Sequence, residues 1–222
     1  VTNIEKLTTK ADKHMTATLD TLAAAAGITE VTFADTGETK DSLTLKAGFT
    51  SAITVNLDDT GNGAGDNTLD ASAYVGAGLT VKTTFENVDQ ATDLKLTGSA
   101  LTTDIYQIST SAVGHGAMAL QTGVTGFETF NIVDGDAAAA KTNAFHLADE
   151  NVAYTNSDDY ASVTIDASTI TASDTPDVLT IDASDETNGK LTIKGGPNAE
   201  TIRTTQSVNF GDTITAGAGT DT

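Results

Sequence analysis

The chain has 222 residues, of which 31 are acidic and 11 basic, so its formal net charge at pH 7 is −20. A surface this negative repels nucleic acid and anionic membranes, and we expect neither as a partner. There is no Cys and no Trp, so disulfides cannot stabilise the chain, and no stretch approaches the roughly 18 apolar residues of a membrane-spanning helix.

Short segments in which apolar and polar residues alternate recur along the chain, separated by turn residues. This alternation is the pattern of half-buried strands, and a spacing of roughly 8–12 residues is typical of a sandwich, a barrel or a solenoid. Residues 115–126 fit no element clearly. The expected strands are, in chain order, residues 1–7, 28–34, 42–46, 53–57, 68–71, 79–83, 85–88, 94–97, 105–109, 127–133, 145–147, 152–154, 162–166, 178–182 and 190–194.

Residues 12–26 are the best candidate for a helix. Leu19, Leu22 and Ala26 fall at helical spacing there, and Gly27 could end the helix. The threonines of this segment are poor helix formers, so a strand followed by one helical turn is the alternative.

Several short sequence motifs recur along the chain. The segments 68–72, 164–168 and 180–184 all read Thr, Leu or Ile, Asp, Ala, Ser. The last two start 180 − 164 = 16 residues apart, about one small solenoid coil. Echoes of this kind indicate stacked units, none of which can bury its apolar face alone. Because the spacing is irregular, we predict an all-β fold, an irregular parallel β-solenoid of β-helix or β-roll type, with sandwich-like portions and short helical turns.

The end of the chain is rich in glycine and acidic residues. Residues 195–222 match in part, three times, the nonapeptide G-G-x-G-x-D-x-U-x (U is a large apolar residue), a calcium-binding turn of a parallel β-roll. Glycines allow a tight turn that exposes carbonyl oxygens, and calcium takes six to eight oxygens at about 2.3–2.6 Å. Asp212 and Asp221 are 221 − 212 = 9 residues apart, one nonapeptide. The candidate metal-site residues are Gly196, Asn198, Glu200 (in place of Asp), Asp212, Gly217, Gly219 and Asp221.

A second candidate calcium loop covers residues 58–67. It fits the nonapeptide in part, and it also fits an EF-hand-like loop whose last position is Leu69 instead of the bidentate Glu. A plain hairpin turn is the alternative. The candidate ligands in this loop are Asp58, Asn62, Asp66 and Asn67.

The terminal stretch resembles the repeats-in-toxin (RTX) calcium-binding family, and the Thr-, Ala- and Asp-rich body resembles the bacterial surface-layer and adhesin proteins that carry such repeats. The resemblance implies export by a type I secretion route, folding driven by calcium outside the cell, and self-association into a lattice or fibre, with cell-surface polysaccharide as a further partner. We expect a repetitive β-rich body at residues 1–194 and the start of an RTX-like β-roll at residues 195–222. The chain is expected to be a piece of a longer protein, with its terminal calcium site half built.

An enzyme is not expected. Aromatic residues make up 5% of the chain and there is no Trp, whereas a sugar site usually needs aromatic platforms. Neither H-E-x-x-H nor G-x-S-x-G occurs. The predicted function is a structural segment of a secreted bacterial cell-surface protein, a surface-layer lattice or an adhesin, stabilised by calcium. The alternatives are a structural protein of a phage or virion appendage and a non-catalytic scaffold of a secreted polysaccharide-acting enzyme. The acidic excess fits dependence on divalent cations and solubility in a high-salt medium equally well.

Overall fold

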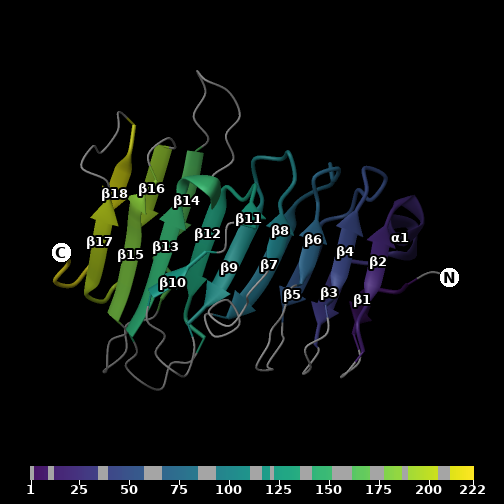
Figure 1. Cartoon of the computed structure of the whole chain (residues 1–222), viewed down its shortest axis with the longest axis horizontal. Coiled ribbons are helices and arrows are strands. Elements are labelled where there is room, and N and C mark those ends of the chain that lie inside the picture. Colours follow the sequence, from purple (N-terminus) through teal and green to yellow (C-terminus); the bar gives the residue numbers. More distant parts are fainter. Residues whose placement is uncertain are drawn as a thin grey trace.

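The described residues form an almost all-β solenoid of parallel sheets, as predicted. The structure is a computed structural model that describes residues 3–9, 13–34, 40–57, 67–84, 94–110, 117–120, 123–135, 142–151, 162–170, 178–186, 190–204 and 211–222. All the strand pairings in these ranges are parallel. The coils stack along the long axis of the molecule, so the two ends of the chain lie far apart (Figure 1).

One long sheet runs the length of the solenoid and takes one strand from each coil (Figure 1). Its inward positions form a continuous apolar column, because alternate side chains of a strand point to opposite faces. Seven residues of this column, from Val31 to Ile193, are fully buried. The strands of the long sheet are, in spatial order, β1 (Lys6–Thr8), β3 (Glu30–Phe33), β5 (Ile53–Leu57), β7 (Leu79–Thr84), β9 (Ile105–Ser109), β12 (Thr129–Val133), β14 (Ser162–Asp166), β16 (Lys190–Lys194) and β18 (Thr213–Thr215).

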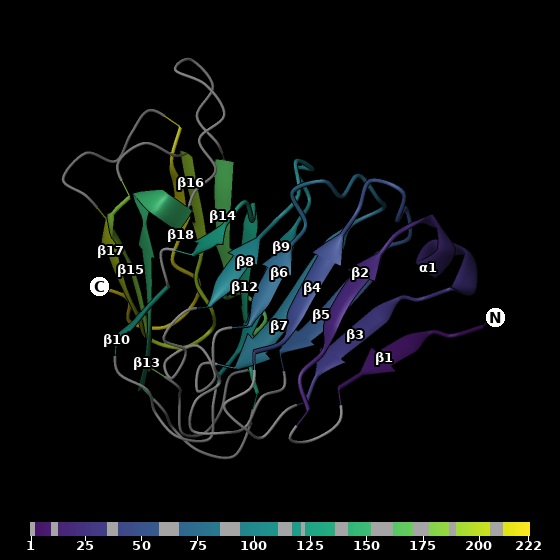
Figure 2. The same cartoon turned by 45° about the vertical axis from the view of Figure 1, so that its right-hand side comes forward.

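The second face of the solenoid is divided between two shorter sheets. The N-terminal sheet lies against the first half of the long sheet (Figure 2), and the C-terminal sheet follows it along the axis. In spatial order, the N-terminal sheet contains β11 (Val124–Thr125), β8 (Lys95–Thr97), β6 (Thr68–Asp70), β4 (Ser42–Leu45) and β2 (Thr16–Leu19), and the C-terminal sheet contains β10 (Ala117–Ala119), β13 (Thr142–Ala148), β15 (Val178–Asp185) and β17 (Glu200–Thr204).

The change from one short sheet to the other occurs in the coil that contains both β10 and β11. The 3₁₀ turn η1 (Asp149–Asn151) packs beside β11 in place of a further strand. Asn151 is fully buried, and its Nδ2 donates to the carbonyl of Val124 at 2.9 Å while its Oδ1 accepts from the amide of Ala148 at 3.2 Å. The Asn151 side chain thereby supplies a hydrogen bond that a next strand would otherwise make.

Aromatic side chains fill the core around this change of cross-section. The rings of Tyr106 and Phe127 lie 5.4 Å apart, and those of Phe130 and Phe145 lie 5.6 Å apart. All four residues are at most 1% exposed. Each large ring buries about 150–250 Å² of surface. The rings therefore fill the core where the two short sheets both pack against the long sheet.

The repeated five-residue segments share one local turn. In each of the segments 68–72, 164–168 and 180–184, the Asp Oδ1 accepts from the amide of the Ser two residues later, at 3.1, 3.0 and 3.0 Å. This turn competes with the sheet ladder, and β6 and β14 end at its Asp, whereas β15 continues to Asp185. The interpretation of the 16-residue spacing as one coil was wrong: β14 pairs with β16, and β15 lies in the C-terminal sheet, so the spacing leads from one face to the next within a coil.

The N-terminal segment follows the alternative given for residues 12–26. It contains β2 and then the short helix α1 (Thr21–Ala26). Asp20 caps the helix by accepting from the Leu22 amide at 2.8 Å, and Gly27 ends it at φ 90°. The β-branched Thr16 and Thr18 prefer a strand, which is why the longer helix does not form.

The other predicted strands agree with the structure to different degrees. Residues 53–57, 105–109, 162–166 and 190–194 are strands with the predicted bounds. Residues 85–88 and 152–154 lie outside the described residues. Both β17 and β18 occur in the stretch that was assigned to calcium turns. β17 extends the C-terminal sheet and β18 extends the long sheet, and the division at residue 194 stays a prediction.

Candidate metal centre

The glycine-rich stretch forms two stacked turns, one after β16 and one after β18. The Gly195 amide donates to the Thr215 carbonyl at 2.7 Å, and the Ala218 amide donates to the Gly196 carbonyl at 3.1 Å. A Cβ atom at Gly195 would overlap the carbonyl group of the turn below it, so only glycine allows this stacking distance. The turns therefore bring the two acidic ends of the stretch into adjacent coils.

Glu200 is the first residue of β17 and points into the solenoid. Its register partner in β15 is Leu179, an inward residue that is 1% exposed. Glu200 is itself 2% exposed, and neither of its carboxylate oxygens has a hydrogen-bond donor at ordinary geometry. A carboxylate thus occupies a position that an apolar side chain holds in the neighbouring coil, which is costly unless a charge or proton compensates.

Asp221 lies in the next coil, 21 residues on, and faces Glu200. Its Oδ1 accepts from the Glu200 amide at 3.1 Å. The Thr222 amide donates to the Glu200 carbonyl at 3.0 Å, and the Ile202 amide donates to the Thr222 carbonyl at 2.8 Å, which fixes the turn against β17. We call Glu200, Asp221 and the glycines around them the terminal carboxyl corner.

The pKa of Glu200 records the cost of this placement. Burial raises the pKa of the Glu200 carboxyl to about 7, and the neighbouring Asp221 carboxylate adds to the rise. The amides of Gly196 and Asn198 face the carboxyl and lower its pKa in part. At neutral pH the corner is therefore completed either by a proton or by a cation.

Six of the predicted terminal residues meet in these two turns, and one does not. Asp212 lies before β18, at the opposite end of that strand from Asp221, and its Oδ1 accepts from the Leu191 amide at 2.9 Å. The nine-residue spacing thus spans a strand and a turn. The residues that the structure brings together are Gly196, Asn198, Glu200, Gly217, Gly219 and Asp221.

The second candidate loop is described only at its last residue. Asp58, Asn62 and Asp66 lie outside the described residues. Asn67 is 3% exposed, and its Oδ1 accepts from the Asp41 amide at 3.0 Å. The Asn67 side chain therefore holds the start of β6 to the coil before it.

The terminal carboxyl corner fits calcium in part. Glu200 and Asp221 offer hard oxygen ligands, which calcium prefers, and neither buried oxygen of Glu200 has a hydrogen-bond donor at ordinary geometry. Calcium takes six to eight oxygens, so backbone carbonyls and water would complete the shell. Within the ranges that the structure describes, there is no cluster of three or more His, Asp or Glu side chains suited to a metal.

A second carboxyl pair, not predicted as a site, lies at the start of β9 and β12. Asp104 is fully buried, and its amide donates to Glu128 Oε2 at 3.0 Å across adjacent coils. A sequence signal exists for three of these four acids: Asp104, Glu128 and Glu200 each stand two residues before an apolar residue, Tyr106, Phe130 and Ile202. The strand alternation therefore turns each acid inward.

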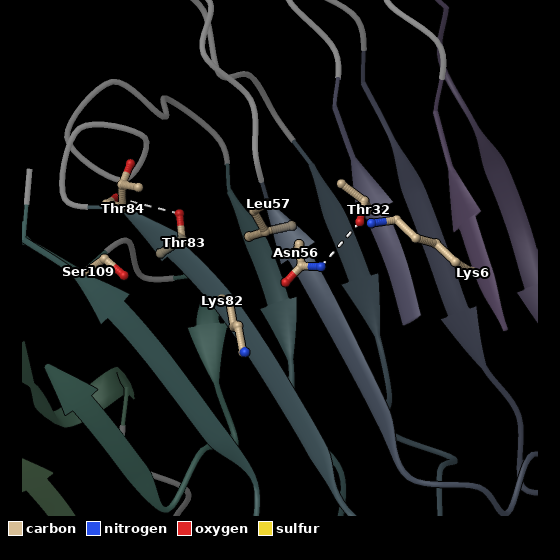
Figure 3. A pocket seen from close by; sticks show the side chains of 8 residues that line it. All are labelled: Lys6, Thr32, Asn56, Leu57, Lys82, Thr83, Thr84 and Ser109. Atoms are coloured by element: carbon tan, nitrogen blue, oxygen red, sulfur yellow. Dashed lines mark hydrogen bonds between the residues drawn. The ribbon is translucent and has the colours of Figure 1, made fainter. Parts of the chain in front are cut away.

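A polar groove lies on the outer face of the long sheet (Figure 3). Asn56 Nδ2 donates to Thr32 Oγ1 at 3.2 Å there, and the Lys6 ammonium group pairs with Glu30 beside it at 2.6 Å. The groove thus offers hydroxyl, amide and ammonium groups. Its lining residues are Lys6, Thr32, Asn56, Leu57, Lys82, Thr83, Thr84 and Ser109.

No known protein family, curated protein or solved structure matches the chain. Among the described residues there is no helix long and apolar enough to span a membrane.

Proposed function

We propose that the chain is a structural segment of a secreted bacterial cell-surface protein, part of a surface-layer lattice or an adhesin, and that calcium stabilises it. The observation that carries this proposal is the terminal carboxyl corner, where Glu200 and Asp221 face each other from adjacent coils. Two facing carboxylates with one buried repel at neutral pH, and calcium would replace that repulsion by attraction.

The shape of the molecule supports a structural role. A solenoid transmits force and spacing along its axis because each coil contacts chiefly its neighbours. The net charge of −20 also favours a setting where divalent cations are abundant, since the charge otherwise opposes both folding and self-association. Outside the cell, calcium would couple folding to secretion.

The polar groove supports cell-surface polysaccharide as a partner. Hydroxyl, amide and ammonium groups at neighbouring outward positions of the long sheet can hydrogen-bond the hydroxyl groups of a glycan. The double substitution of Asn56 and Lys82 by Ala would weaken retention on immobilised surface polysaccharide, while Thr164→Ala, on the same face, would leave it unchanged.

Self-association tests the proposal directly. Static light scattering of the chain at neutral pH should show higher mass or ordered assemblies when calcium is added, and dispersal by a chelator. Glu200→Gln should weaken this response, whereas Glu30→Gln, at the outer face, should leave it intact. A mass that is identical with calcium and with chelator at every protein concentration would contradict the proposal.

A further inference from the structure

The Asp104–Glu128 pair repeats the geometry of the terminal carboxyl corner at a different edge of the solenoid. In both places an acid at the start of a strand donates its amide to the acid of the next coil, at 3.0 Å from Asp104 to Glu128 and at 3.1 Å from Glu200 to Asp221. Asp104 and Glu128 are 24 residues apart in sequence, and Glu200 and Asp221 are 21 residues apart. We call Asp104, Glu128 and the glycines beside them the central carboxyl corner.

The glycines around the two corners also correspond. The Gly98 amide donates to the Thr125 carbonyl at 2.8 Å, as Gly195 does to Thr215 at 2.7 Å. A Cβ atom built on Gly98 would overlap the carbonyl group of Gly126 and lie 3.2 Å from Asp104 Oδ2. A Cβ atom built on Gly195 would overlap a carbonyl in the same way and lie 3.2 Å from Glu200 Oε2.

Among the described residues, one carboxylate oxygen of the central corner has no hydrogen-bond donor at ordinary geometry. Asp104 is 0% exposed, and its Oδ2 accepts from the Ser99 amide, but its Oδ1 is buried without a donor. The adjacent Glu128 carboxyl uses Oε2 for the Asp104 amide. A buried, unpaired carboxylate oxygen beside a second carboxyl is a strong ligand for a hard cation.

Among the described residues, no positive charge compensates the two acids. Burial raises the pKa of Asp104, and burial together with Asp104 raises the pKa of Glu128 to about 7. The groups that face Asp104 are the Leu79 amide, which lowers the pKa of this carboxyl in part, and the phenol of Tyr74. The Tyr74 hydroxyl lies 2.6 Å from the Ser51 carbonyl oxygen and 2.9 Å from that of Gly78. In the part of the chain that the structure describes, no Lys or Arg contributes to the pKa shift of either acid.

We propose that the central carboxyl corner is a second divalent-cation site, in which Asp104 Oδ1 and the Glu128 carboxyl bind a calcium ion between two adjacent coils. The inference rests on the proposed function for the identity of the cation. Backbone carbonyls of the stacked turns and water complete the coordination shell. One ion here and one at the terminal corner would join coils on both sides of the change of cross-section.

The site can be tested with Tb³⁺, which takes the same hard oxygen ligands as calcium and emits when a nearby tyrosine is excited. Tyr74 and Tyr106 lie at this corner. Wild-type chain should give tyrosine-sensitised Tb³⁺ emission that calcium displaces. In Asp104→Asn with Glu128→Gln, which keeps both hydrogen-bond acceptors and removes the charges, the affinity should fall at least about tenfold. Glu200→Gln should keep the emission.

The single variant Glu128→Gln, at the less buried residue, gives the same test if the double variant fails to fold. Emission that is equal in wild type and in these variants would overturn the proposal, because the cation would then lie elsewhere. Absence of emission from wild type would also overturn it and leave a shared proton as the occupant of the corner. Failure of the proposed function has a different signature: Glu200→Gln would then leave the calcium dependence of self-association unchanged.

Discussion

Glu200, Asp104 and Glu128 occupy inward positions at the starts of strands, where the next inward residue along the strand is apolar. The side chain of the later coil reaches back and accepts from the backbone amide one coil earlier, as Glu128 accepts from Asp104 and Asp221 from Glu200. Asp41 and Asn67 at the N-terminal sheet follow the same rule without a paired acid. The inward position at the start of a strand therefore has two uses: a hydrogen-bond acceptor alone, or one member of a carboxyl pair that needs a proton or a cation.

We expect Glu200→Gln to raise the melting temperature in the presence of a chelator near pH 8 and to remove part of the stabilisation by calcium. The amide keeps an oxygen toward Gly196 and Asn198 but ends the repulsion from Asp221. The gain should be about 1 kcal/mol, or a shift of roughly 2–4 °C. Glu30→Gln, which loses the charge pair with Lys6 and keeps an oxygen that can accept from Thr32 and Asn56, is the matched control. A lower melting temperature in chelator would contradict this account of Glu200.

We expect Gly98→Ala and Gly195→Ala to destabilise the chain by about 1–3 kcal/mol each. A Cβ atom at either position overlaps a backbone carbonyl of the neighbouring turn, which cannot move without breaking a stacked hydrogen bond. Urea unfolding measures the loss. Thr80→Ala, on the outer face of β7, should change stability by less than about 0.5 kcal/mol. Stability of Gly98→Ala equal to wild type would show that the turns are not packed as described.

At the scale of the elements, the arrangement of strands changes where the second face passes from the N-terminal to the C-terminal sheet. Here Asn151 completes the hydrogen bonding of β11 in place of a strand. We expect Asn151→Ala to cost about 1–3 kcal/mol, because it leaves the Val124 carbonyl without this donor in a buried place. Asn151→Asp should cost at least as much, since a carboxylate would face that carbonyl. Thermal melting of both variants measures this cost. A melting temperature of Asn151→Ala equal to that of wild type would show that Asn151 does not stabilise this part of the solenoid.

Strands could be predicted from the sequence where alternation is regular, as in residues 53–57 and 105–109. β17 and β18 could not, because they are short and the glycine and acidic residues on either side of them favour turns. The change between the two short sheets was also missed, because it depends on contacts between residues 124 and 151, which are far apart in sequence. The residues of the terminal corner were predicted as one group, and that group also contained Asp212, which lies elsewhere. The central corner was overlooked because no known motif marks it.

At the scale of the whole molecule, the carboxyl corners predict an unusual pH dependence in the absence of metal. Glu128 and Glu200 have pKa values raised from 4.5 to about 7 by burial. Their neutral forms therefore add stability that is complete below about pH 4.5 and is lost as the pH rises through about 7. After allowance for partial solvent screening, we expect a loss of about 1–2 kcal/mol per group.

Melting in a chelator from about pH 5 to pH 8 measures this loss. The aspartates that end strands, such as Asp70 and Asp166, do not change the stability in this pH range. Their pKa values are lowered, so these carboxyls take up protons only at more acidic pH. Glu128→Gln combined with Glu200→Gln should flatten the profile. A melting temperature that rises steadily toward pH 8 in chelator would contradict the proposed state of both corners.

The central claim is that calcium completes the interior of this solenoid, and thermal melting at about pH 8 with calcium or with a chelator tests it most directly. Calcium at about a hundred times its dissociation constant should add about 2.7 kcal/mol per site. The melting temperature should therefore rise by at least roughly 5 °C, and magnesium should substitute poorly because it demands a tighter octahedral shell. An unchanged melting temperature in calcium, magnesium and chelator would contradict the claim.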